Sequence, residues 1–410
     1  MTAPLRILVA TPLPATVTGG IEEYAYGVAE ALRSKGHEVS VLTTRYSGGE
    51  GETSARVTSL EAKELLGRPV CFHLRSYLKL PFLVRRSDAV HVHMPFPFVE
   101  AAVAFLAKLM GRPLVVTYHM DARVDGASEG GAKWLHHLAE RVYRAVSAVP
   151  TVELADRVCT NSRAYALQSP VLRDRSERLH VVHQGIDPGK FREFSREKSD
   201  DVRRQLLGEE YSDLVCFVGR LVPYKGLSVL LESVRRLDRG RTLFVIGGRG
   251  PEEPRLRRTI EDHHLTNVRL IGYVPDADLM NLFGAADLVL SPSVSSLEST
   301  PITLLYATAA GTAVLGTDVG GTAECIPNDG VNGLVVPAGD PVALGQAICR
   351  LLDVGSERGA ETSPRFWSDV AEEYGHVLKL MRRGEGATPT AWGDAHPIAY
   401  AGPPETAGGK

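Results

Sequence analysis

The chain of 410 residues lacks the marks of several protein classes. Its five cysteines are scattered, odd in number and without a Cys-x-x-Cys pair, which argues against a disulfide scaffold or a zinc site and favours a reducing compartment. No apolar run approaches the roughly 20 residues of a membrane-spanning helix. Residues 1–6 lead straight into an apolar run without the layout of a signal peptide, so we expect a cytoplasmic location.

An excess of charge of either sign is also missing. The formal net charge is −3 and the pI is about 6.5, a balance that gives no overall case for binding nucleic acid or an anionic membrane. Hydrophobic residues make up 44% of the chain and charged residues 23%, which is ordinary for a globular protein. The length is enough for two domains of about 150 to 200 residues each.

Both halves of the sequence begin with the same pattern. Residues 5–11 form a short, mostly apolar run that predicts a buried parallel strand, and a loop, an amphipathic helix over 21–35 and a second strand over 38–43 follow it. A new apolar strand over 214–218, followed by a helix over 227–237, restarts the pattern. This order predicts an α/β protein with two doubly wound parallel sheets.

Two features of the first half lie where such sheets bind ligands, beyond the carboxyl ends of strands. The loop after the first strand ends in Gly19 and Gly20, which would let backbone approach a ligand closely. His119 directly follows the strand predicted over 114–118, and this position favours a functional role over a structural one. His91 and His93 lie inside a predicted strand, and we interpret them as structural because no carboxylate cluster completes a metal site.

Arg220 and Lys225 flank a turn after the first strand of the second half. A diphosphate needs positive charge held close together, with small residues such as Gly219 and Gly226 giving it access. The turn is not a Walker motif, which needs Gly-Lys-Ser/Thr in that order. Two exposed surface cations are the alternative.

A second loop of this kind, residues 291–301, follows an apolar strand and precedes a helix predicted to end at Gly311. Thr300 is the expected N-cap and Pro301 the expected first helical residue. The N–H groups and dipole of a helix start attract anions, so Ser299, Thr300 and Ile302 would surround a phosphate, with Glu298 beside it. An ordinary strand-loop-helix turn is the alternative.

Taken together, these motifs resemble family 4 of the retaining glycosyltransferases, which have the GT-B fold. The resemblance covers residues 5–383. In chain order it rests on Gly19-Gly20, His119, the turn 184–188, Arg220 with Lys225, the loop 247–251, Glu298 and residues 320–324. It implies two facing Rossmann-like domains with a central cleft, a nucleotide-sugar donor on the second domain and an acceptor on the first.

The resemblance also implies roles for individual residues. Arg220 and Lys225 would stabilise the leaving diphosphate in place of a metal, Glu298 would hold sugar hydroxyls, and His119 would contact the donor sugar. No cofactor or metal is expected, and the reaction would transfer a hexose from a UDP- or GDP-linked donor to an acceptor hydroxyl with retention of configuration. The positions that correspond to donor contacts in the family are Gly19, Gly20, Gly247, Gly248, Tyr273, Val274, Ser299, Thr300, Pro301, Ile302 and Tyr306.

The expected division has four parts. Residues 1–187 form the acceptor domain and residues 188–363 the donor domain. Residues 364–383 form a closing helix that returns to the first domain, and residues 384–410, which have little apolar content, form a disordered tail. Residues 75–86 mix basic and apolar side chains, and we leave open a peripheral membrane contact, an acceptor site and an amphipathic packing helix.

Tyr306 departs from the family pattern, which has a second glutamate there, eight residues after Glu298. If Tyr306 faces the ribose, donor affinity is low and Tyr306→Glu should tighten nucleotide binding; the alternative is a core residue on an inward helix face. Two rival functions therefore remain open: a nucleotide-sugar epimerase of the same fold, and a catalytically weak donor-binding protein.

Overall fold

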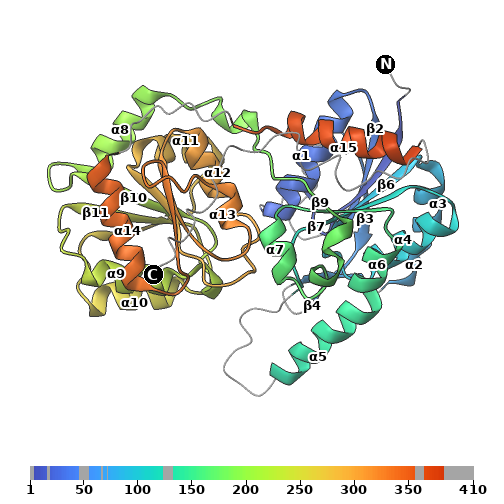
Figure 1. Cartoon of the computed structure of the whole chain (residues 1–410), viewed down its shortest axis with the longest axis horizontal. Coiled ribbons are helices and arrows are strands. Elements are labelled where there is room, and N and C mark those ends of the chain that lie inside the picture. The colour runs from blue at the N-terminus through green and yellow to red at the C-terminus, as the bar shows by residue number, and fades with distance from the viewer. Residues whose placement is uncertain are drawn as a thin grey trace, which may run out of the picture. The chain divides into compact units, whose positions relative to one another are not determined.

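The computed structural model describes residues 4–15, 19–45, 55–65, 68–71, 73–122, 133–355 and 364–382. The chain divides into two compact units (Figure 1). Unit 1 contains the chain up to Gly185 together with the segment that begins at Arg365, and unit 2 runs from Ile186 to Pro364. These divisions fall beside the boundaries expected at 187/188 and 363/364. The expected tail, residues 384–410, lies outside the described residues.

Unit 1 is built on a sheet of seven parallel strands within the described ranges, in the order β3-β2-β1-β6-β7-β8-β9. The strands are β1 (Arg6–Ala10), β2 (Glu38–Arg45), β3 (Arg56–Glu61), β6 (Ala89–Met94), β7 (Leu114–Tyr118), β8 (Arg157–Thr160) and β9 (Leu179–Val181). A separate antiparallel hairpin pairs β4 (Lys63–Leu65) with β5 (Arg68–Val70).

Helices cover both faces of this sheet, as its buried apolar strands require. The helical segments of unit 1 are α1 (Gly20–Ser34), α2 (Leu74–Tyr77), α3 (Leu80–Arg86), α4 (Val99–Leu109), α5 (Lys133–Tyr143), the π-helical turn η1 (Arg144–Ala148), α6 (Val149–Leu154), α7 (Arg163–Gln168), the 3-10 segment η2 (Arg173–Arg178) and α15 (Trp367–Arg382). Alternate strand residues point to opposite cores. Leu8 and Val92 pack with α3, α4 and α6, whereas Ile7 and Val115 pack with α1 and α15.

The closing helix α15 packs against α1 within unit 1. Val370, Tyr374 and Val377 on α15 are buried against Tyr24 and Val28 of α1. Burying a large apolar side chain contributes about 1.5 to 3 kcal/mol, so this helix, which is distant in sequence, belongs to the core of the unit.

Unit 2 contains six parallel strands in the part of the chain that the structure describes, in the order β12-β11-β10-β13-β14-β15. They are β10 (Asp213–Val218), β11 (Thr242–Gly247), β12 (Val268–Gly272), β13 (Leu288–Ser291), β14 (Ala313–Thr317) and β15 (Gly333–Val336). The helical segments are η3 (Pro188–Phe191), α8 (Arg196–Leu207), η4 (Pro223–Lys225), α9 (Leu227–Arg236), α10 (Glu253–Asp262), α11 (Asp276–Ala285), α12 (Ile302–Ala309), α13 (Thr322–Cys325) and α14 (Pro341–Val354).

The strand order of unit 2 reverses between β10 and β13. In a doubly wound sheet, the connections from two such strands leave toward opposite faces, and ligands bind beside this point at the carboxyl edge. The loops that follow β10 and β13 are residues 219–226 and 292–301. The topology therefore brings together the two loops that carry Arg220, Lys225 and Glu298.

Candidate active site

The loop after β10 is held against the loop after β13 by backbone contacts. Gly226 has φ +67°, and a Cβ atom there would lie 1.9 Å from the carbonyl oxygen of Pro292, so only glycine fits. The Val294 N–H donates to the Tyr224 carbonyl at 2.8 Å. These contacts fix the short turn η4, which ends at Lys225, beside the loop that carries Glu298.

Lys225 and Glu298 form a buried ion pair. Their side chains are 14% and 8% exposed, and the Ser293 hydroxyl donates to the same Glu298 oxygen at 2.9 Å. Burial, the largest single cause, lowers the pKa of Lys225, but the charge and hydrogen bond of Glu298 together with Tyr224 raise it, so the net direction is upward and the ammonium group is retained. Arg220, which lies on the same loop after β10, lowers the pKa of Lys225 through its charge.

A third loop, after β14, supports Glu298 from another side. Gly320 has φ +55°, and a Cβ atom there would lie 1.7 Å from the Glu298 carbonyl oxygen. The Gly321 N–H donates to the Ser299 carbonyl at 3.0 Å, and the Thr317 hydroxyl donates to the Ser293 carbonyl at 2.5 Å. The backbone around Glu298 is therefore fixed by the neighbouring strand connection.

The loop after β11 completes this edge of the sheet. Gly248 has φ +132°, and a Cβ atom there would lie 1.8 Å from the Gly219 carbonyl oxygen. Gly247 is buried against Val274, and the neighbouring Tyr273 is 54% exposed. The residues that sequence reasoning assigned to donor binding in unit 2 thus lie on adjoining loops at one edge, with the exception of Tyr306.

The start of α12 differs from the prediction by one residue. Pro301, with φ −78° and ψ 87°, is the N-cap residue, and the helix begins at Ile302. The expected N-cap Thr300 is instead a buried loop residue, because Ser299 just before it is tied to Gly321. The first N–H groups of α12, which have no intrahelical carbonyl partner, still lie close to Ser299 in the chain.

Tyr306 lies in the alternative environment that the sequence left open, the core. Its side chain is 1% exposed, and its hydroxyl oxygen accepts a hydrogen bond from the Asp187 N–H at 2.9 Å. The Lys190 ammonium lies 5.0 Å from the centre of its ring, and the centre of the Phe191 ring lies 6.4 Å away, with the two ring planes tilted by 38°. Tyr306 therefore connects residues 187–191 to α12. A contact between Tyr306 and a ribose stays a prediction, and the buried position of the side chain does not favour it.

Tyr306→Phe is expected to lower the free energy of unfolding by about 1 kcal/mol, because the Asp187 N–H loses its acceptor. Nucleotide affinity should not change. Urea unfolding and nucleotide titration of the same variant measure the two effects separately. A weaker nucleotide affinity at unchanged stability would restore the ribose contact and contradict the core role.

Unit 1 carries the remaining predicted residues. Gly19 is the N-cap of α1 and Gly20 its first residue; a Cβ atom at Gly19 would lie 2.3 Å from a carboxylate oxygen of Glu22. His119 follows β7 as expected, but it is 2% exposed and both ring nitrogens have partners. Its Nε2 lies 2.9 Å from His93 Nδ1, and its Nδ1 lies 3.3 Å from the side-chain nitrogen of Asn161.

His119 belongs to a buried polar cluster between the sheet and the helices α1 and α15. His91 Nε2 lies 2.8 Å from the Thr117 hydroxyl, which lies 2.6 Å from the Tyr374 hydroxyl. Burial lowers the pKa of His91 and of His119 to about 3, and the pKa of His93 well below its usual value. Burial therefore favours the neutral form of all three rings. His91 and His93 lie inside β6 and are buried, as a structural role requires, and that role stays an interpretation.

Ser293 and Asn161 are the residues that sequence reasoning missed. Ser293 bonds Glu298 from five positions earlier in the same loop, and Asn161 reaches His119 from the end of β8. The only available signal was their position just after predicted strands, which many polar residues share.

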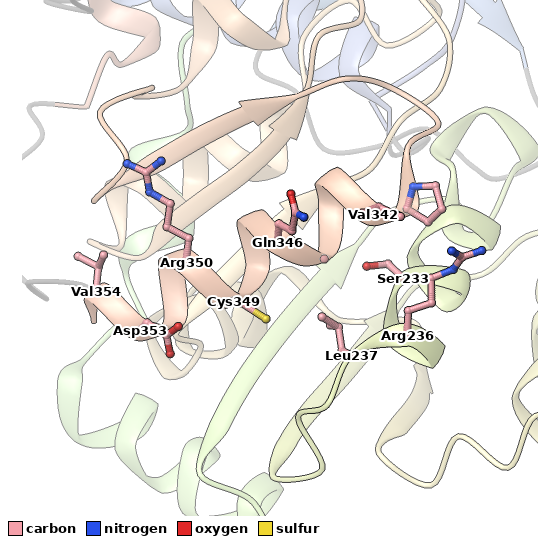
Figure 2. Close-up of a pocket in the computed structure, with 11 residues that line it drawn as sticks. Ser233, Arg236, Leu237, Val342, Gln346, Cys349, Arg350, Asp353 and Val354 are labelled. Atoms are coloured by element: carbon pink, nitrogen blue, oxygen red, sulfur yellow. The ribbon is translucent and has the colours of Figure 1, made fainter.

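The structure also has a cavity of about 550 Å³ between α9 and α14 (Figure 2). None of the predicted site residues lines it. Two of its charged groups already have partners, since Arg236 pairs with Glu232 and Asp353 with Arg239. The cavity brings together no set of groups suited to catalysis.

Comparison with known proteins identifies the family. A model described as Glycosyltransferase Family 4 matches residues 18–190, and one described as Glycosyl transferases group 1 matches residues 198–361. D-inositol 3-phosphate glycosyltransferase of Mycolicibacterium smegmatis is 30% identical over 381 residues, which cover 86% of this chain and 84% of that protein.

Solved structures show the same fold. Sucrose-phosphate synthase of Thermosynechococcus elongatus superposes with a TM-score of 0.71 at 19% identity, over 93% of this chain and all of that one. Anabaena HepE, in a complex with UDP-glucose, gives 0.68 at 19% identity, over 92% and 99%. The chain belongs to family 4 of the glycosyltransferases, has the GT-B fold and is a sugar-transferring enzyme.

Proposed function

We propose that the enzyme takes a hexose from a nucleoside diphosphate donor and transfers it to an acceptor hydroxyl with retention of anomeric configuration. The observation that carries this proposal is the Lys225–Glu298 pair, with Arg220 close by, at the point where the strand order of unit 2 reverses. Two cations and a carboxylate on adjoining loops suit a ligand with an anionic diphosphate and a hydroxyl-rich sugar.

Arg220 and Lys225 stabilise the negative charge that develops on the leaving diphosphate. In this structure Glu298 already holds the Lys225 ammonium, so a bound diphosphate becomes a second, competing partner for that cation. Glu298 is then available for sugar hydroxyls. The two cations supply the positive charge that a metal supplies in other transferases, and the proposal therefore includes no metal.

The donor contacts extend along the same edge of the sheet. Gly247 and Gly248 leave room beside β11, and the exposed Tyr273 ring next to Val274 offers a surface for a base. UDP is a reasonable first donor to test, because HepE was solved with UDP-glucose. In unit 1, Gly19, Gly20 and His119 remain proposed contacts, and a ligand at either His119 nitrogen would replace the hydrogen bond to His93 or to Asn161.

None of the helices within the described ranges has the length and apolar content that crossing a membrane requires. A cytoplasmic location stays a proposal, and it rests on the five scattered cysteines of the sequence.

Thermal unfolding in the presence of UDP, GDP or ADP tests the donor site. One of the three is expected to stabilise the protein by about 2.7 kcal/mol at 100 times its dissociation constant. Arg220→Ala should abolish this shift, whereas Arg258→Ala, which removes an exposed cation on α10 away from the proposed contacts, should keep it. If no diphosphate stabilises the wild-type chain, the proposed donor class is wrong. Incubation of the matching nucleotide sugar without acceptor then separates a transferase from an epimerase.

A further inference from the structure

In unit 1, one layer of helices has large apolar side chains on its outer surface, where they are exposed and do not pack in the core. α2, α3, α4 and η1 lie on the same face of the sheet, and α4 contacts both α3 and η1. α5 continues directly into η1 and extends away from the rest of the unit (Figure 1). We call the outward side chains of these five segments the outer helix surface.

The stretch 75–86 supplies one end of this surface. It forms two short helices, α2 and α3, which bury Leu80 and Val84. Leu74, Leu78 and Phe82, spaced by four residues, point outward and are 75%, 70% and 57% exposed. Of the three interpretations left open for this stretch, the packing helix describes the inner face, which is buried in the core. The outer face is equally apolar and has no cover among the described residues.

α5 and η1 repeat the arrangement. Trp134, Leu138, Val142 and Val146 follow one another at intervals of four, and each is about half exposed or more. Four residues separate neighbours on one helix face, so these side chains form a single stripe. On α4, Phe105 and Leu109 are spaced in the same way and are also exposed. Isolated exposed apolar residues are common, but three such stripes on adjoining helices indicate an interaction surface.

The same segments are basic. Residues 74–86, 99–109 and 133–148 contain eight lysines and arginines and two acidic residues, Glu100 and Glu140, in a chain whose net charge is −3. Glu100 is buried, and Glu140 is only partly exposed. Arg75, Lys79, Arg141 and Arg144 are exposed next to the apolar stripes. Apolar stripes flanked by exposed cations are the composition of helices that lie in a lipid interface.

We propose that the outer helix surface docks unit 1 on an anionic membrane, with the apolar stripes entering the interface and the cations facing lipid headgroups. A second copy of this chain fits less well, because a symmetric dimer would place this basic surface against itself. A bilayer with anionic lipids complements the charge and the apolar stripes together. An acceptor anchored in the same bilayer would then be held close to unit 1.

Sedimentation of the full chain with lipid vesicles tests the proposal. The protein should bind vesicles that contain phosphatidylglycerol and not vesicles of phosphatidylcholine alone, and added salt should weaken binding. Arg141→Gln with Arg144→Gln should lower partitioning about 30-fold, given roughly fivefold for each cation. Phe82→Gln with Leu138→Gln should lower it on the order of tenfold.

Two controls separate docking from a general effect of charge or folding. Arg33→Gln on α1 and Arg257→Gln on α10 remove exposed cations outside the surface and should leave vesicle binding unchanged. The fluorescence of Trp134 should shift to shorter wavelength on anionic vesicles, and this change should disappear in Trp134→Phe. Equal binding to neutral vesicles, or binding that the Arg141/Arg144 variant retains, would overturn the proposal. A concentration-dependent dimer that Leu138→Gln dissociates would overturn it too.

Discussion

Lys225→Ala is expected to lower the rate of sugar transfer by about 100-fold or more. The lysine is the most shielded cation beside the proposed diphosphate position, and charge stabilisation in a shielded site is worth far more than in water. Steady-state transfer assays, run with the nucleotide sugar identified by the thermal screen, measure this loss. A rate within a few-fold of the wild type would exclude Lys225 from the catalytic step.

Stability must be measured with the rate, because Lys225→Ala leaves Glu298 buried without its cation. Removing one member of a buried pair typically costs about 3 to 5 kcal/mol. Lys225→Ala/Glu298→Gln should recover most of this stability but none of the rate, which separates the two losses.

Glu298→Gln alone should keep nucleoside diphosphate affinity, since it releases Lys225, while transfer falls. Lys198→Ala, which breaks an exposed lysine–glutamate pair in the same unit, is the matched control and should change neither property appreciably.

The fold was largely predictable because its strands are buried on both faces. β7 was predicted to the residue, over 114–118, and β10, predicted over 214–218, begins only one residue earlier. β3 was missed because it is an edge strand with a mostly polar, partly exposed sequence. α5 continues into the π-helical turn η1, which helical periodicity in a sequence does not reveal.

The candidate site was predictable where it depends on strand ends and not where it depends on tertiary contacts. Arg220, Lys225 and Glu298 gather because parallel strands put their carboxyl ends at one edge. The spacing of Tyr306 from Ile302 gives a shared helix face, but not which part of the protein that face meets. Its partner Asp187 is 119 residues away, and only the folded chain shows that contact.

Mild acid is expected to lower the free energy of unfolding of unit 1 by a large share of the total that an ordinary domain has. His91, His93 and His119 are buried between the sheet and the helices α1 and α15, next to Tyr24 and Tyr374. Burial lowers all three pKa values, to about 3 for His91 and His119 and well below the usual value for His93. The neighbouring histidines lower the pKa values of His93 and His119 further.

The sign of the effect follows from which state binds protons. Below the unfolded value of 6.5, the unfolded chain takes up protons that the folded cluster excludes, so falling pH favours unfolding. Each histidine then contributes a slope of up to about 1.4 kcal/mol per pH unit, and the three together remove about 4 kcal/mol between pH 7.5 and 5.5. A typical domain has only about 5 to 15 kcal/mol in total.

Urea unfolding of unit 1 at a series of pH values, followed through the buried Trp367, measures the slope. His91→Gln should reduce the slope by about a third even if it also lowers stability at every pH, because one titrating group is gone. His263→Gln removes an exposed histidine of unit 2 and should leave the slope unchanged. A stability that stays flat between pH 7.5 and 5.5 would mean that the cluster accepts a proton in the folded state. The hydrogen bonds of His119 with His93 and Asn161 would then have to rearrange, which would make His119 able to titrate within the fold.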